Sequence, residues 1–80
     1  MELSILKRLG LPPKLRDSIT NLSCPDIFEL ADGRFAVIGS DLTEQLSPLL
    51  PADAACADYE RIVVITRATL VSARLDIPDC

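Results

Sequence analysis

The stretch that decides the fold runs from residue 26 to residue 38 and reads DIFELADGRFAVI. Apolar and polar residues alternate in its first half, which is typical of a half-buried strand. The pair Asp32-Gly33 then indicates a two-residue hairpin turn, because a type I′ turn needs positive φ at both central positions. We therefore expect a β-hairpin whose second strand runs from Arg34 to Ile38.

A third strand is expected farther along the chain, where residues 61–65 read RIVVI. A continuous β-branched run of this kind is typical of a strand covered on both faces. Because the hairpin pairs its own two strands, the run would lie at the edge of a small three-stranded antiparallel sheet. An apolar edge strand needs a cover. We favour a cover by N-terminal helices of the same chain, and the alternative is pairing with a second copy or a partner protein.

Helical periodicity is found before the hairpin. Ile5, Leu6 and Leu9 share one stripe of a short amphipathic helix that ends at Gly10. Two prolines at residues 12 and 13 then open a second expected helix, which continues to residue 22. The chain is thus divided into an N-terminal helical segment, residues 1–22, and an α+β core, residues 23–80, within a single domain.

Two further helices are expected after the hairpin. Asp41 and Glu44 have the spacing of a capping box, so a short helix should begin there and end before Pro51. Residues 51–60 lack a periodic pattern and are expected to form a loop. Thr66 can cap a C-terminal helix, in which three apolar residues are expected to face inward: Leu70, Val71 and Leu75. The predicted fold is therefore α+β, with N-terminal helices, a three-stranded sheet and a C-terminal helix.

Charge and composition restrict the function. The chain has 80 residues, is 49% hydrophobic and carries a net charge of −4. That hydrophobic content excludes a disordered acidic tail. The negative charge argues against nucleic acid as the main partner, because such binding depends on clustered Lys and Arg. Four basic and two acidic residues lie up to residue 22, for a net +2, and four basic and ten acidic residues follow, for a net −6.

The residue types offer little chemistry. The sequence has no histidine, which removes the commonest general base, the usual catalytic triads and most zinc sites. Cys24, Cys56 and Cys80 form no C-x-x-C pair, and for Cys24 we favour a packed small side chain over a reactive thiol. The acidic loop residues lack the spacing of a calcium-binding loop. We therefore expect no enzyme activity, no metal and no cofactor.

The chain also shows no secretory or membrane signal. Its first residues contain no continuous apolar region of a signal peptide. No apolar run approaches the roughly 20 residues that a membrane-spanning helix needs. Three widely separated cysteines do not make the even disulfide framework of small secreted domains. A cytoplasmic protein is expected, with no membrane partner and no small-molecule ligand.

Several sequence features resemble known proteins. They are the stretch from Cys24 to Leu30, Asp32-Gly33, the stretch from Phe35 to Gly39, the stretch from Glu60 to Ile65, and Thr69-Leu70. In these features the chain resembles a group of short uncharacterised actinobacterial proteins. It is more loosely similar to the small acidic BldB-like proteins, which accompany WhiJ-type helix-turn-helix regulators in streptomycetes. That family has an aromatic residue in its final helix, where this sequence has Leu70 and Val71.

The resulting hypothesis is a non-catalytic protein-interaction module. It would act by self-association as a homodimer or by binding a partner protein, such as a helix-turn-helix transcription regulator or a toxin. An acidic protein surface would speed encounter with a basic partner. The alternative is a nucleic-acid-binding protein that uses the basic N-terminal helices. The expected contact residues are Ile62, Val63, Val64, Ile65, Lys7, Arg8, Lys14 and Arg16.

Overall fold

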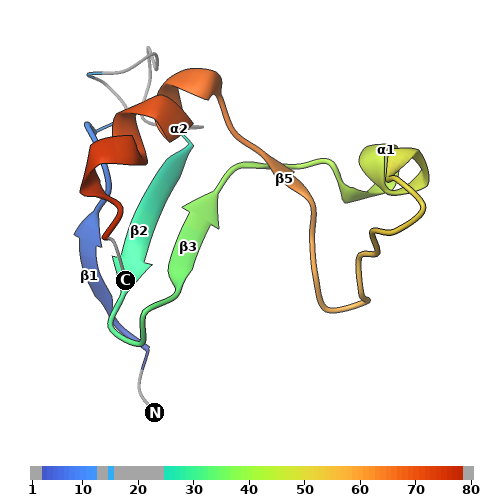
Figure 1. Cartoon of the computed structure of the whole chain (residues 1–80), viewed down its shortest axis with the longest axis horizontal. Coiled ribbons are helices and arrows are strands. Elements are labelled where there is room, and N and C mark those ends of the chain that lie inside the picture. The colour runs from blue at the N-terminus through green and yellow to red at the C-terminus, as the bar shows by residue number, and fades with distance from the viewer. Residues whose placement is uncertain (1–2, 13–14, 16–24, 79–80) are drawn as a thin grey trace.

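The computed structural model describes residues 3–12, 15 and 25–78. Within these residues the protein is α+β, with a three-stranded antiparallel sheet of order β1-β2-β3, a separate two-stranded ribbon β4-β5 and two short α-helices (Figure 1). The strands are β1 (Ile5–Arg8), β2 (Asp26–Leu30), β3 (Phe35–Ile38), β4 (Ser40–Asp41) and β5 (Val63–Val64). The helices are α1 (Thr43–Leu46), the 3-10 turn η2 (Ser47–Leu49), α2 (Arg67–Ala73) and the 3-10 turn η3 (Arg74–Asp76).

The predicted hairpin is confirmed as β2 and β3, but its turn differs from the expected one. The Gly33 N–H donates to the Leu30 carbonyl at 3.1 Å, so the closed turn centres on Ala31 and Asp32. Gly33 follows with a φ of +92°. A glycine in this left-handed conformation completes a three-residue hairpin loop, residues 31–33, in place of the expected two-residue turn.

The third strand of the sheet is β1, where the sequence predicted a helix. β1 pairs with β2 in antiparallel register, with Lys7 opposite Glu29 and an irregularity between Ile5 and Lys7. The pairing extends past both ends of β1. The Leu9 N–H donates to the Ile27 carbonyl at 2.9 Å, and the Ala31 N–H donates to the Ser4 carbonyl at 2.9 Å. An isolated helix of eight residues is unstable in water, because nucleation costs more than so few hydrogen bonds return. Pairing with an open strand edge satisfies the same backbone groups.

The rest of the predicted N-terminal helical segment lies mostly outside the described residues. Of the second expected helix, only Pro12 and Leu15 are described, and the Leu15 N–H donates to the Pro12 carbonyl at 2.9 Å. The prediction of a helical pair at the N-terminus is therefore wrong in its first member, and its second member lies outside the described residues.

Residues 61–65 do not join this sheet. Only Val63 and Val64 among them form a strand, and they pair with β4 instead. Gly39 directs the chain away from the sheet, because its Cα lies so close to β5 that a Cβ there would be 2.6 Å from the Val64 carbonyl oxygen. The predicted edge strand is thus one side of a ribbon that leaves the sheet.

The C-terminal helix is confirmed, and its Thr66 cap accepts a hydrogen bond from the Thr69 N–H. Its predicted orientation is wrong. The residues expected to face inward are exposed: Leu70 by 56%, Val71 by 51% and Leu75 by 86%. The buried positions of α2 are Thr69 and Ala73.

Docking of the segment after β1 explains this orientation. The Gly10 N–H donates to the Asp76 carboxylate at 2.7 Å, and the Leu11 N–H donates to the Ser72 hydroxyl at 2.8 Å. Gly10 has a φ of +83°, and a Cβ on it would lie 2.7 Å from the Ser72 carbonyl carbon. Only small and polar side chains allow such a close approach. The face of α2 that carries Thr69, Ser72 and Ala73 is therefore turned toward the sheet.

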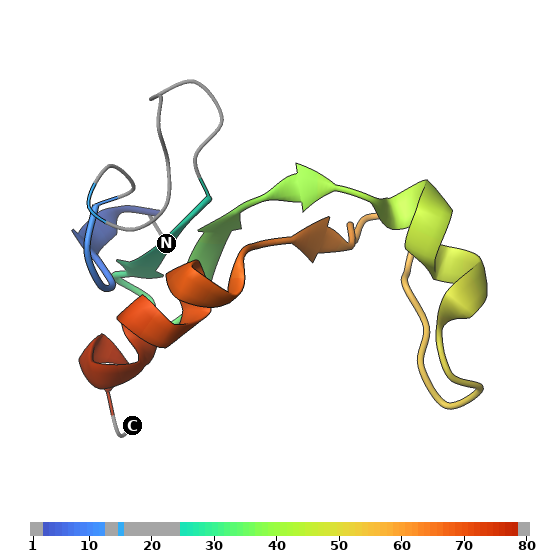
Figure 2. The ribbon, with the colours of Figure 1, turned by 90° about the horizontal axis from the view of Figure 1, so that it is seen from above.

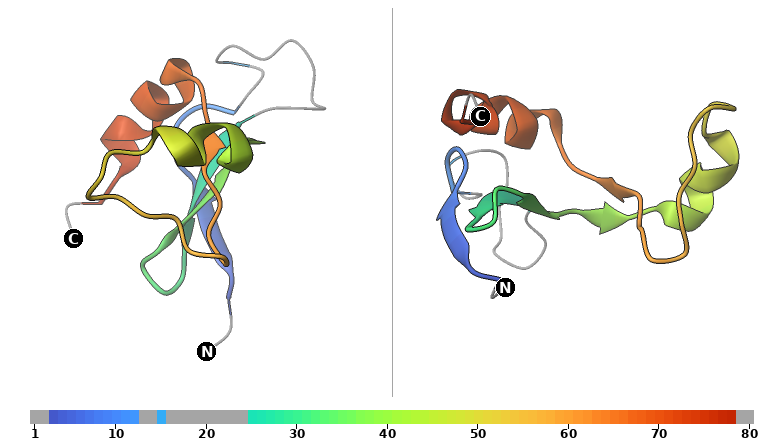
Figure 3. Two further views of the ribbon diagram at one scale, coloured as in Figure 1. Left: turned by 90° about the vertical axis from the view of Figure 1, so that its right-hand side faces the viewer. Right: turned by 60° about the horizontal axis from the view of Figure 1, so that its bottom comes forward.

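The core is correspondingly small. Among the described residues it consists of Leu9, Ile27 and Ala73, with the partly buried Ile65 packed against them. From this core the ribbon and α1 extend away from the sheet, as Figure 2 and the right view of Figure 3 show. The Cα radius of gyration is 14.0 Å, against about 11.6 Å for a compact 80-residue domain.

Gly10→Ala should lower the free energy of unfolding by about 2–4 kcal/mol, because the new Cβ combines a strained φ with a backbone clash at Ser72. Gly33→Ala is the matched control: its φ is also positive but nothing lies within 4 Å, so a loss of about 1 kcal/mol is expected. Urea unfolding followed by circular dichroism measures both. Equal losses would contradict the proposed docking of Gly10 on α2.

Candidate interaction surface

Residues 40–64, here called the arm, contain no buried residue, although the structure describes all of them. The arm comprises β4, α1, η2, the following loop and β5. Its apolar side chains are partly or fully exposed, and Leu49 is 73% exposed. A two-stranded ribbon is marginally stable in water unless something covers one of its faces. The arm therefore has apolar surface but no core of its own.

Polar contacts hold the base of the arm. The Asp41 carboxylate accepts hydrogen bonds from the Thr43 hydroxyl at 2.6 Å, from the Thr43 N–H at 3.1 Å and from the Arg61 guanidinium at 3.0 Å. The Thr43 hydroxyl accepts from the Ile62 N–H at 2.7 Å. The short helix begins where the sequence predicted it, but the capping box of Asp41 and Glu44 is wrong, because Leu42 occupies the cap position and Glu44 makes no reciprocal hydrogen bond among the described residues.

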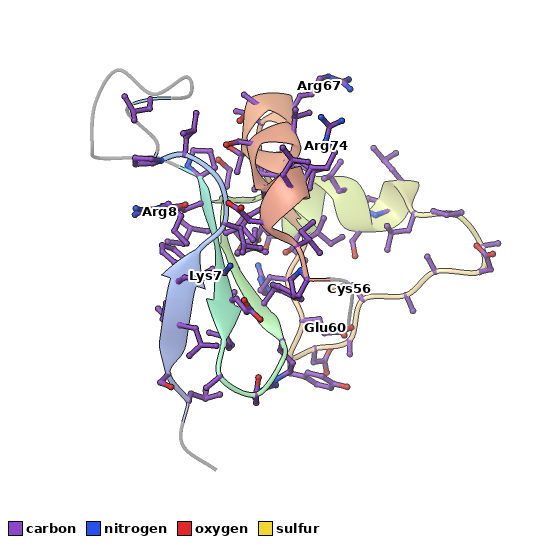
Figure 4. The ribbon with its side chains drawn as sticks, turned by 60° about the vertical axis from the view of Figure 1, so that its left-hand side comes forward. Lys7, Arg8, Cys56, Glu60, Arg67 and Arg74 are labelled. Carbon is purple, nitrogen blue, oxygen red and sulfur yellow. The ribbon has the colours of Figure 1, made fainter. Side chains whose placement is uncertain are left out.

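The loop between η2 and β5 is held by Glu60. The Ala57 N–H donates to the Glu60 carboxylate at 2.9 Å, and the Glu60 N–H donates to the Ala57 carbonyl at 2.9 Å. The Cys56 thiol lies 3.3 Å from the Glu60 carbonyl oxygen, and Figure 4 shows these two side chains close together. Exposed hydrogen bonds of this kind each add about 1 kcal/mol or less to stability, so they do not replace a core.

A second surface lies on α2. Arg67, Leu70, Val71 and Arg74 follow the i, i+3, i+4, i+7 spacing of one helical face, and we call these four residues the α2 stripe. All four are exposed. Both arginines project from α2 away from β1 and β2 (Figure 4), and neither forms an ion pair with any described residue. The α2 stripe is an apolar centre flanked by two arginines that form no ion pair within the described part of the chain.

The arm and the rest of the chain differ in charge. The arm has five acidic residues and one basic residue, which gives it a net charge of −4. Seven basic and seven acidic residues make up the remainder of the sequence, so that part is neutral. The whole net charge of the protein is therefore carried by the segment that extends from the sheet.

The predicted basic surface is divided by the strand geometry. Lys7 and Arg8 are adjacent in β1, so their side chains leave opposite faces of the sheet (Figure 4). The single Arg8 Nε–H points at both oxygens of the Asp26 carboxylate, at 2.9 and 3.1 Å, and the guanidinium lies 5.2 Å from the centre of the Phe28 ring. Asp26 is 4% exposed, so Arg8 serves as a partner for a buried carboxylate. Lys14 and Arg16, like Cys24 and Cys80, lie outside the described residues.

The predicted apolar contact residues do lie together in the ribbon. Val63 and Val64 are 38% and 41% exposed, and Ile62 is half-buried beside Thr43. Ile65 differs from them because it packs against the core. Three of the four residues therefore belong to the arm and the fourth anchors its base.

Sequence reasoning missed the α2 stripe. The i, i+3, i+4 pattern of α2 was interpreted as a buried face, which is its commonest meaning. A signal was present: both positions that flank Leu70 and Val71 on that face are arginines, and the opposite face holds Thr69, Ser72 and Ala73, which are small. Such a helix can pack its small face closely and leave its larger apolar residues outside.

Comparison of the chain with protein-family models, with curated proteins and with solved structures found no match. Within the described residues, no three His, Cys, Asp or Glu side chains gather where they could hold a metal ion. Nor does that part of the chain include a helix long and apolar enough to cross a membrane.

The Asp41 network predicts a pH dependence of the arm. Hydrogen bonds from Thr43 and then from Arg61 lower the pKa of Asp41 from 3.8 to about 2. Because the carboxylate form is favoured in the folded arm, its stabilising effect is complete above pH 4 and is lost as the pH falls through about 2. A ¹³C NMR titration should give the Asp41 carboxyl a midpoint near pH 2, and Thr43→Val should move it toward 3.8. A midpoint near 3.8 in the unsubstituted protein would show that this network does not form.

Arg8→Ala should lower the free energy of unfolding by about 1–2 kcal/mol, because it removes the charge-assisted Nε–H hydrogen bond that the two oxygens of the buried Asp26 carboxylate share. Lys7→Ala on the same strand should change it by less than about 0.5 kcal/mol, since its side chain is exposed and makes no hydrogen bond or ion pair among the described residues. Urea unfolding of the two variants at one protein concentration provides the comparison. If the two variants lose similar amounts of unfolding free energy, the structural role assigned to Arg8 is wrong.

Proposed function

We propose that this protein is a non-catalytic, cytoplasmic protein-interaction module that binds other proteins through the arm. The observation that carries the proposal is that residues 40–64 expose Leu49, Val63 and Val64 and leave their other leucines only partly covered, yet include no buried residue. A segment that cannot bury its apolar surface within its own chain gains stability by burying it against another.

The size of the exposed surface supports the same proposal. The chain has an accessible surface of 6329 Å², against roughly 4,700 Å² for a compact monomer of its mass. The exposed apolar side chains Leu49, Val63 and Val64 of the arm are part of that surface.

The similarity to BldB-like proteins gives this module a candidate role. A helix-turn-helix regulator would be one partner of that kind, and a toxin would be another. The charge of the arm favours a partner whose contact surface is apolar and basic, because complementary charge speeds encounter and suppresses wrong partners.

Nucleic acid binding is a weaker hypothesis. It needs Lys7, Arg8, Lys14 and Arg16 on one surface. Lys7 and Arg8 leave opposite faces of a strand, and Arg8 is already paired with Asp26. None of these contacts favours a basic groove for a phosphate backbone.

Leu49→Asp tests the proposed function. The leucine is 73% exposed, so the substitution should leave the fold intact while it places a charge on the apolar surface of the arm. Leu3→Asp is the matched control, since Leu3 is 64% exposed and lies outside both the arm and α2. Affinity purification with quantitative mass spectrometry would compare the tagged wild type with both variants in the cells that produce the protein.

At least one protein should be recovered with the wild type and with Leu3→Asp, and its recovery should fall at least tenfold with Leu49→Asp. A helix-turn-helix protein or a toxin among the proteins lost would agree with the role suggested by the resemblance. If all three baits recover the same proteins in the same amounts, the arm is not a binding element and the proposal fails.

A further inference from the structure

We propose that the arm of one copy of this protein docks on the α2 stripe of a second copy, so that two chains form a reciprocal dimer. This inference rests on the proposed function, because it names the partner that covers the arm. It starts from a single property of the chain: one molecule displays two uncovered apolar surfaces of opposite charge.

The first surface is the arm, whose exposed apolar residues include Leu49, Val63 and Val64. The segment that carries these residues has a net charge of −4. The second surface is the α2 stripe, in which Leu70 and Val71 are more than half exposed between Arg67 and Arg74. In the proposed dimer, the apolar residues of the acidic arm contact the apolar residues of the α2 stripe, which two arginines flank. Such a match of apolar surface and of opposite charge is expected of a specific interface.

The arm is poorly placed to cover the α2 stripe of its own chain. β5 ends at Val64 and α2 begins at Arg67, so only Ile65 and Thr66 connect them. Ile65 packs against the core, and Thr66 caps α2. Folding the arm back would break both contacts and the close approach of Gly39 to Val64. The same anchors hold the arm away from its own sheet, where a second chain can reach it (Figure 2).

The proposed dimer contains two identical contacts, each between one arm and one α2 stripe. Two such contacts arise together in a twofold arrangement, because each chain contributes one arm and one α2 stripe.

The test is the mass in solution, measured by light scattering after size exclusion at 100 μM chain and at lower concentrations. The wild type should have twice the 8.7 kDa mass of the chain. Leu49→Asp in the arm and Leu70→Asp in the α2 stripe should each raise the dissociation constant at least tenfold, while Leu3→Asp should leave it unchanged. Arg74→Glu should weaken the dimer more than Arg34→Glu, which changes the net charge equally at the hairpin tip.

Mixing the two defective variants distinguishes arm exchange from other dimers. A chain with Leu49→Asp keeps an intact α2 stripe, and a chain with Leu70→Asp keeps an intact arm. Their mixture should form a heterodimer through the one intact arm and stripe, although each variant alone is monomeric. A dimer that forms by contact of like surfaces would gain nothing from mixing, and that result would overturn the proposal.

A wild type that has the mass of one chain at 100 μM would also overturn the inference. The affinity purification would then test the proposed function on its own. Proteins recovered with the wild type but not with Leu49→Asp would be the partners that bind the arm. If the wild type is monomeric and that bait also loses nothing, both the dimer and the interaction module fail. Circular dichroism of each variant checks that its fold is retained.

Discussion

The close approach of Gly10 to α2 is the contact on which the described structure depends. A glycine with positive φ allows the backbone after β1 to lie against Ser72, and the N–H groups of Gly10 and Leu11 bond to Asp76 and Ser72. This contact fixes the rotation of α2 about its own axis. The small, polar face of the helix turns inward, and its larger apolar residues are left in solvent.

The rotation of α2 limits the core and thereby defines the surface. Thr69 and Ala73 contribute little apolar area, so the core is confined to a few residues around Ile27. The leucines and valine that would ordinarily fill it form the α2 stripe and its margin. A small domain already buries a modest share of its surface, and a core reduced in this way makes association with another chain favourable.

The arm follows from a second close contact, at Gly39. β4 begins directly after Gly39 and pairs with β5, so from that point the chain no longer lies beside β2. The arm is then organised by exposed polar contacts around Asp41 and contains no buried residue. Its shape is thus set by hydrogen bonds, while its apolar residues remain available for binding. The arm and the α2 stripe are two consequences of glycine-dependent backbone contacts.

Local patterns in the sequence determined the hairpin at Asp32-Gly33, the Thr66 cap, the start and end of the C-terminal helix and the short helix before Pro51, since each depends on neighbouring residues. The tertiary structure alone decided that Ile5–Arg8 is a strand, that Val63–Val64 pairs outside the sheet and that Leu70 faces solvent. These three features depend on which segment pairs with an open strand edge and on how closely Gly10 and Gly39 approach distant backbone. Periodicity within one segment carries no information about such contacts, because they join residues far apart in the chain.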